Sequence, residues 1–240
     1  MQNWQVSFRK ILLLLVIGAP FALKAETAPN RIALRNHPFI PPAGEFLIPS
    51  PIPEGEDGRV HLLIQLEKHL QAGDRARFEA RGVRLLHYFP DRAYVASMPC
   101  GIHKSVLQEL GVRWAGPLLI ESKIHPRILQ DIWGDWSRYD AARRVFAVSL
   151  MKDVGLETVR RALTLRGFEV GDELLSTHLL FVAAFPEQVR ELAALDFVLY
   201  IAEAPPPLTP TNDVARQRVH ADEVQLMPYD LSGRGVTACL

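Results

Sequence analysis

The chain has 240 residues, with 27 Lys and Arg against 27 Asp and Glu and with 48% hydrophobic residues. A formal net charge of zero argues against a nucleic-acid-binding protein, which usually has a basic excess or a basic face. The apolar content is too high for a disordered tail, and two cysteines are too few for a disulfide-dense scaffold. The length fits one or two domains of roughly 100–200 residues each.

The first 25 residues have the pattern of a secretory signal peptide. Arg9 and Lys10 supply the positive charge, and residues 11–17 form an unbroken apolar run. This run is shorter than the roughly 20 apolar residues that a membrane span needs. We expect cleavage after Ala25, which places the mature chain in a secreted or periplasmic compartment with no membrane association. An uncleaved N-terminal anchor is the alternative.

Residues 26–58 are predicted to form an extended linker. The segment is dense in proline, which fixes φ and removes a backbone donor, so no helix or sheet of its own is expected. A second proline-rich break, from Pro205 to Pro207, follows the folded part of the chain and opens the segment 205–240.

Between these breaks, residues 59–121 are predicted to form a first module. Alternating apolar residues indicate strands, an apolar stripe at helical spacing indicates a helix, and Gly82 and Gly111 are natural helix ends. Two strand-like runs joined by a short turn with Pro90 predict an antiparallel hairpin. The expected elements are a strand at 60–66, a helix at 73–81, hairpin strands at 83–89 and 93–98, a helix at 102–110 and a strand at 112–120.

Residues 144–204 repeat this order as a second module, after a connector at 122–143. Arg81 and Gly82 correspond to Arg166 and Gly167, and comparable positions recur at an offset of 85 to 87 residues, which indicates two copies of one unit. The expected elements are a strand at 144–150, a helix from 156 that stops at Gly167, hairpin strands at 168–175 and 178–185, a helix after Pro186 and a strand at 197–203.

The predicted fold class is α+β. Each module has the order β-α-β-β-α-β, which is typical of a ferredoxin-like antiparallel sheet with both helices on one face. Leu63, Leu86 and Tyr88 are candidates for the other face of the first sheet. Such a face either binds a partner or is covered by the second module, and the sequence leaves both interpretations open.

No catalytic constellation is found, so we expect no catalytic residue, no metal and no cofactor in this chain. Isolated histidines in or beside predicted elements are expected to be structural or solvated, and Cys100 with His103 is only half of a zinc site. Neither a G-x-S-x-G nor an H-E-x-x-H motif occurs. The remaining candidates, all interpreted as structural or solvated, are His61, His69, His87, His178, the acidic cluster Glu54, Glu56 and Asp57, the connector residues Asp131 and Asp135, and the glycine pair Gly233 and Gly235.

The C-terminal segment resembles the start of the catalytic domain of subtilisin-like serine proteases. The resemblance is carried by Asn-Asp-Val-Ala-Arg at 212–216, His-Ala-Asp at 220–222 and Tyr-Asp-Leu-Ser-Gly-Arg-Gly-Val-Thr at 229–237. In that family a similar pattern leads into a buried strand that ends at the catalytic aspartate; here His220 stands where glycine is commoner. The resemblance implies that residues 236–240 begin this strand and that the catalytic triad lies beyond the chain.

The two modules are similar to the N-terminal pro-regions of such proteases, on the runs at 82–95 and 112–117. The resemblance implies an intramolecular chaperone and temporary inhibitor whose partner is a subtilisin-like catalytic domain, in cis or in trans. It also implies that the sheet packs on two surface helices of the protease and that the last strand leads a peptide into the substrate cleft. On this basis the predicted inhibitory tail is Tyr200, Ile201, Ala202, Glu203 and Ala204, kept extended by the prolines that follow.

Two alternatives remain open at this stage. The chain is either such a pro-region or, in a different functional class, a free-standing secreted binding or inhibitor protein. A tandem ferredoxin-like sensor of a small molecule is a third interpretation, for which the sequence shows no pocket.

Overall fold

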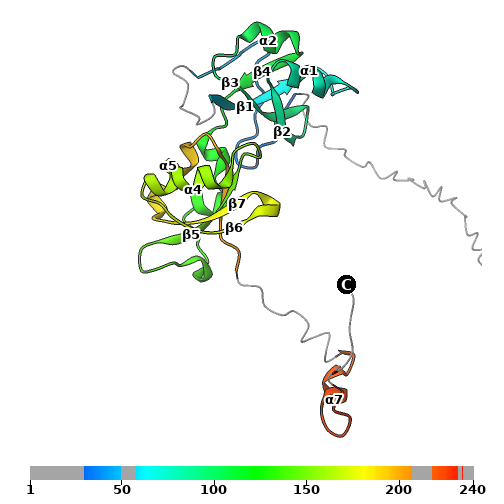
Figure 1. Cartoon of the computed structure of the whole chain (residues 1–240), viewed down its shortest axis with the longest axis vertical. Coiled ribbons are helices and arrows are strands. Elements are labelled where there is room, and N and C mark those ends of the chain that lie inside the picture. Colours follow the sequence, from blue (N-terminus) through cyan, green and yellow to red (C-terminus); the bar gives the residue numbers. More distant parts are fainter. Residues whose placement is uncertain (1–29, 50–57, 207–217, 232–233, 235–240) are drawn as a thin grey trace, which may run out of the picture.

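The computed structural model describes residues 30–49, 58–206, 218–231 and 234 (Figure 1). The signal-peptide prediction with Ala25, the acidic cluster at 54–57, the glycine pair Gly233 and Gly235, and the strand expected at 236–240 lie outside the described residues. Within the described ranges, no helix is long and apolar enough to cross a membrane.

The first module is a four-stranded antiparallel sheet with the strand order β2-β3-β1-β4. Val60, Leu62 and Ile64 alternate along β1 toward one face, where they pack with Phe78 of α1 and Leu107 of α2. The last strand ends earlier than predicted, just before Pro117, because proline cannot donate to the ladder. The elements are β1 (Arg59–Leu66), α1 (Asp74–Ala80), β2 (Arg84–Phe89), β3 (Ala93–Pro99), α2 (Lys104–Glu109) and β4 (Val112–Gly116).

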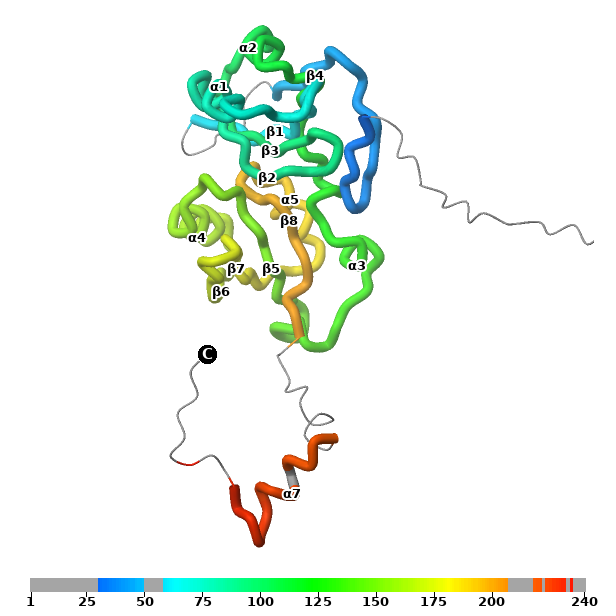
Figure 2. Tube along the Cα trace, turned by 90° about the vertical axis from the view of Figure 1, so that its right-hand side faces the viewer, coloured from blue at the N-terminus to red at the C-terminus, as the bar shows by residue number. Residues whose placement is uncertain are grey.

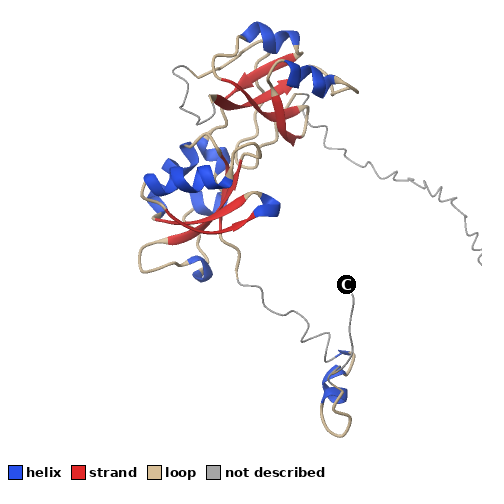
Figure 3. Cartoon of the chain, in the orientation of Figure 1, coloured by secondary structure: helices blue, strands red, loops and turns tan. Residues whose placement is uncertain are grey.

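The second module repeats this arrangement with the strand order β6-β7-β5-β8, also antiparallel. Phe146 and Val148 of β5 pack against Leu163 of α4 and Leu192 of α5, so both helices lie on one face of the sheet (Figure 3). The prediction of two tandem α+β modules is confirmed at this level. The elements are β5 (Arg144–Leu150), α4 (Leu156–Leu165), β6 (Glu169–Leu174), η3 (Leu175–Thr177), β7 (Leu179–Ala184), η4 (Pro186–Gln188), α5 (Val189–Ala194) and β8 (Val198–Glu203).

The connector between the modules is a packed part of the second module. It contains η1 (Ile120–Lys123), α3 (Pro126–Leu129) and η2 (Asp135–Ser137). Ile124 and Ile128 are buried in the second core. Trp133 meets the ring of Phe146 edge-on, with ring centroids 5.9 Å apart. The connector therefore contributes side chains to the core of the second module before the chain enters β5.

The proline-rich segment 30–49 is not the extended linker that was predicted: it turns back on itself through an antiparallel bridge between Ile32 and Phe39, and it packs on the first module. Ile32 and Leu34 are buried against Leu63, Val95 and Trp114, on the face of the first sheet that its helices do not cover. The apolar residues between the prolines supply these contacts, so proline content alone does not identify a spacer.

Each module has the outer edge of its last strand paired with the segment that precedes the module. Phe46 forms a parallel bridge with Ala115 of β4, and Ile124 forms a parallel bridge with Ile201 of β8. An unpaired edge presents free backbone donors and acceptors, and these segments satisfy part of them. The repeated unit is therefore longer than the strands and helices that the periodicity predicted.

The outer face of the first sheet is covered within the chain, which decides the question that the sequence left open for this face. Leu63 is only 1% exposed. Besides segment 30–49, the cover includes Met151, Val154 and Leu199 of the second module, which lies against this face in both views (Figures 1 and 2). Leu86 packs at the margin of this cluster, but the placement of Tyr88 on this face was wrong. Tyr88 pairs with Tyr94, which packs against the helix-side core, and its side chain is 56% exposed.

Candidate functional site

The predicted inhibitory residues form the last strand of the second sheet. Ile201 is fully buried in the core, while Tyr200 and Ala202 are half-buried. β8 pairs with β5 on one side, and on the other the amide of His125 donates to the carbonyl oxygen of Ile201 at 2.9 Å. A strand that is paired on both sides and anchored by a core side chain cannot enter a cleft without unfolding the sheet edge.

The end of β8 is tied to the connector. The carboxylate of Glu203 accepts hydrogen bonds from Ser137 Oγ at 2.6 Å and from the amide of Gly134 at 2.5 Å. The indole of Trp136 donates to the carbonyl oxygen of Ala204 at 2.9 Å. Pro205 and the residue after it are therefore the first that leave the sheet. They line a shallow hollow with His125, Arg127 and Trp136.

The outer face of the second sheet is apolar and more open than that of the first. Ala147 pairs with Phe181 and with Ala202, and period-two alternation places all three opposite the helices. Phe181 is only half-buried, whereas Val95, at the corresponding place of the first sheet, is 1% exposed. The other residues on this face are Val145, Ser149, Leu179, Ala183 and Tyr200, with Glu169 and Leu174 of β6 at its edge.

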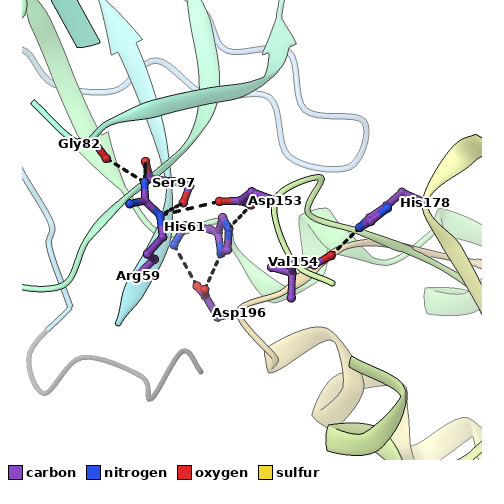
Figure 4. A network of polar contacts seen from close by, with 8 residues as sticks. All are labelled: Arg59, His61, Gly82, Ser97, Asp153, Val154, His178 and Asp196. Carbon is purple, nitrogen blue, oxygen red and sulfur yellow. Dashed lines mark hydrogen bonds and ion pairs between the residues drawn. The ribbon is translucent and has the colours of Figure 1, made fainter. Parts of the chain in front are cut away.

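A buried cluster of charges lies where the two modules meet (Figure 4). His61 of β1 contacts Asp196 through Nδ1 at 2.6 Å and Asp153 through Nε2 at 2.9 Å. Its backbone amide also donates to Asp196, at 3.2 Å. Asp153 comes from the turn between β5 and α4, and Asp196 from the turn between α5 and β8. Both carboxylates thus cross from the second module to one histidine of the first.

Arg59 extends this cluster within the first module. Its Nε lies 3.9 Å from the carboxylate of Asp153 and donates to Ser97 Oγ at 2.7 Å. Its terminal nitrogen donates to the carbonyl oxygens of Ser97 and Gly82, at 2.9 and 2.8 Å. Arg59 therefore binds the first module through these hydrogen bonds and also lies near the carboxylate of Asp153.

The charge state of the cluster follows from these contacts. Burial by itself lowers the pKa of His61, but the hydrogen bonds to Asp153 and Asp196 and their negative charges outweigh burial and raise the pKa to about 9. Burial acts on Asp153 in the opposite sense, and the hydrogen bonds from His61 and Ser97 outweigh it and lower the pKa to about 2. At neutral pH the cluster therefore holds an imidazolium between two carboxylates.

A buried lysine lies beside this cluster. Lys123 donates through Nζ to the carbonyl oxygen of Leu195 at 3.0 Å, and it lines a small cavity with His61 and Asp196. Burial lowers the pKa of Lys123 to about 8, against the opposing effect of the charge on Asp196.

The other candidates from the sequence are not brought together. Cys100 is a free, half-buried thiol, and His103 caps α2 by accepting from the amide of Ser105. The part of the chain that the structure describes contains no group of three residues able to hold a metal ion. Asp131 accepts from the indole of Trp133, whereas Asp135 is fully exposed, 3.9 Å from an arginine.

Sequence reasoning placed His61 among the isolated histidines and missed its role at the joint. Its two partners lie 92 and 135 residues farther along the chain. One signal was present: a histidine inside an otherwise apolar strand needs a polar partner when that strand is buried on both faces. The face of β1 that carries His61 is buried by the contact with the second module, which the sequence does not indicate.

Comparison with known proteins connects one part of the chain to a family. A family model described as a domain of unknown function, DUF8729, matches residues 33–119. The match begins in the segment that covers the first sheet and ends just after β4, so it contains the first module together with its edge-pairing segment. Neither the curated proteins nor the solved structures gave a match.

Proposed function

We propose that the two modules are the pro-region of a secreted subtilisin-like serine protease, acting as an intramolecular chaperone and temporary inhibitor of its catalytic domain. The finer fold assignment belongs to this proposal: each module is a ferredoxin-like unit. The element order β-α-β-β-α-β and the strand orders β2-β3-β1-β4 and β6-β7-β5-β8 support it. The secretory pattern of residues 1–25 supports export of the chain.

The observation that carries the proposal is the position of β8. This strand contributes Ala202 and Tyr200, whose ring lies against Arg35, to the outer face of the sheet, and in the sequence its end is followed by Pro205 and then by the segment 212–237. That segment is the one that resembles the start of a subtilisin-like catalytic domain. The sheet face that β8 helps to form and the segment that resembles the start of a protease are thus close together along the chain.

The two modules then have different roles. The outer face of the first sheet is already covered within the chain, so the second module presents the face for the protease. In this arrangement Tyr200 and Ala202 act as face contacts, Ile201 as a core anchor, and Glu203 and Ala204 as the tether to the connector. The peptide that enters the cleft begins at Pro205, because the preceding residues are held in the sheet.

Inhibition of a subtilisin-like protease by the chain lacking residues 1–25 tests this proposal. We expect slow hydrolysis of a chromogenic peptide in its presence and faster recovery of activity when the denatured protease refolds with it. Phe181→Glu places a charge on the open face and should weaken inhibition at least tenfold, while Tyr88→Glu, on an exposed position of the first module, should not. Unchanged protease activity at saturating concentrations of the chain would contradict the proposal.

A further inference from the structure

The joint between the modules is formed by two turns of the second module that press on the first sheet. The turn after β5 brings Met151 and Val154, which pack in the same apolar cluster as Leu63 and Val95. The same turn carries Asp153, and the turn before β8 carries Asp196. The apolar contact and the carboxylates therefore lie in one interface, and separating the modules breaks both.

His61 is the group in this interface whose hydrogen bonding depends most directly on a proton. Its side chain is 5% exposed, and each ring nitrogen faces a different carboxylate. A neutral imidazole has one N–H donor, whereas an ionised carboxylate only accepts. Neutral His61 would leave either Asp153 or Asp196 facing a nitrogen lone pair at less than 3 Å. An imidazolium donates to both.

The surrounding cations do not replace this proton. Arg59 is held by Ser97 and Gly82 and lies 3.9 Å from Asp153. Lys123 donates to the carbonyl oxygen of Leu195 and acts on Asp196 through its charge. The other charged or titratable groups near the joint are Lys152, His87 and His178; Lys152 and His178 act on His87 through their charges, and a ring nitrogen of His178 donates to the carbonyl oxygen of Val154 at 2.7 Å.

We propose that His61 is a proton-dependent lock between the two modules: protonated, it holds them docked, and deprotonated, it lets them separate. Separation exposes the part of the first sheet's outer face that Met151, Val154 and Leu199 cover, and it frees the second module to move relative to the first. The lock rests on contacts between the modules and is independent of the proposed protease partner.

The pKa shifts of His61 and Asp153 give the direction in which docking of the modules changes with pH. The pKa of His61 is about 9 with the modules docked, against an ordinary 6.5, so its contribution is complete below about pH 6.5 and is lost as the pH rises through 9. Asp153 has a pKa of about 2 against an ordinary 3.8, so its contribution is complete above that value and is lost as the pH falls toward 2. Docking is therefore strongest between these limits.

Small-angle X-ray scattering of the chain lacking residues 1–25, from pH 6 to pH 10, tests the lock. The shift of His61 corresponds to a docking constant that falls roughly 300-fold across this range, so we expect the radius of gyration to rise near pH 9. His61→Gln should be separated already at pH 6. His69→Gln, the same change at an exposed histidine of the first module, should keep the transition.

Two further measurements separate the lock from other causes. Lys123 also loses its proton in this range, so Lys123→Met must keep the transition if His61 is responsible. Titration of the ring resonances of His61 by NMR gives its pKa directly, and Asp153→Asn together with Asp196→Asn should return it toward 6.5. The proposal is overturned if His61 titrates near 6.5 in the unmodified chain, or if the modules stay docked at pH 10.

Discussion

Replacement of His61 by alanine should destabilise the chain by an amount that depends on pH. The variant leaves Asp153 and Asp196 in the buried joint without the imidazolium between them, and both carboxylates carry the same charge. The raised pKa of His61, about 9 against 6.5, corresponds to about 3 kcal/mol of free energy of unfolding at pH 6. Breaking a buried ion pair by removing one partner typically costs about 3–5 kcal/mol, which agrees.

Urea unfolding at pH 6 and at pH 10, followed by circular dichroism, measures this difference. We expect His61→Ala to lower the free energy of unfolding by about 3 kcal/mol at pH 6 and by a much smaller amount at pH 10, where the unmodified chain has lost the same contribution. His69→Ala is the matched control and should change little at either pH. An equal loss for His61→Ala at both pH values would refute the reasoning, because it would show that packing, not charge, is what the histidine supplies.

Two other predictions concern the last strand. Ile201→Ala should destabilise the second module by about 2–5 kcal/mol, because it opens a cavity in a core position that is fully buried. Tyr200→Phe on the same strand is the control and should be close to neutral. Thermal unfolding compares the two variants, and equal melting temperatures would count against the placement of Ile201. Trp136→Phe removes the indole hydrogen bond to the carbonyl oxygen of Ala204, so proteolysis just after β8 should become faster. The melting temperature should fall by only a few degrees, because one hydrogen bond contributes about 1 kcal/mol to the free energy of unfolding. Unchanged cleavage would show that this bond does not fix the chain at the end of β8.

Much of each module could be predicted because its signals are local. Alternation at Val60, Leu62 and Ile64 predicts a strand with one apolar face, and that face is the one under the helices. The glycines at 82 and 167 end helices by adopting positive φ, which other residues rarely do. The repeat itself followed from the recurrence of such positions at a nearly constant spacing.

The candidate site was predicted only in part. Residues 200–204 were correctly placed on and just after the last strand, but their pairing with the connector was not expected. Ile124 pairs with Ile201 through an isolated β-bridge. A single bridge involves only one residue of each segment, so it leaves no periodic pattern in the sequence. The packing of segment 30–49 was missed for a similar reason: its prolines indicated an extended chain, and nothing local indicated that Ile32 pairs with Phe39 or that the segment lies on the first sheet.

By itself, the sequence determined where the strands and helices run and which side of each is apolar, because side-chain periodicity and backbone preferences act over a few residues. Only the tertiary structure decided which apolar face of the two sheets is closed and which is open. It also decided that His61, rather than His69 eight positions later, meets two carboxylates. That choice depends on two turns of the second module reaching β1 from 92 and 135 residues away, and no local pattern encodes a contact between modules.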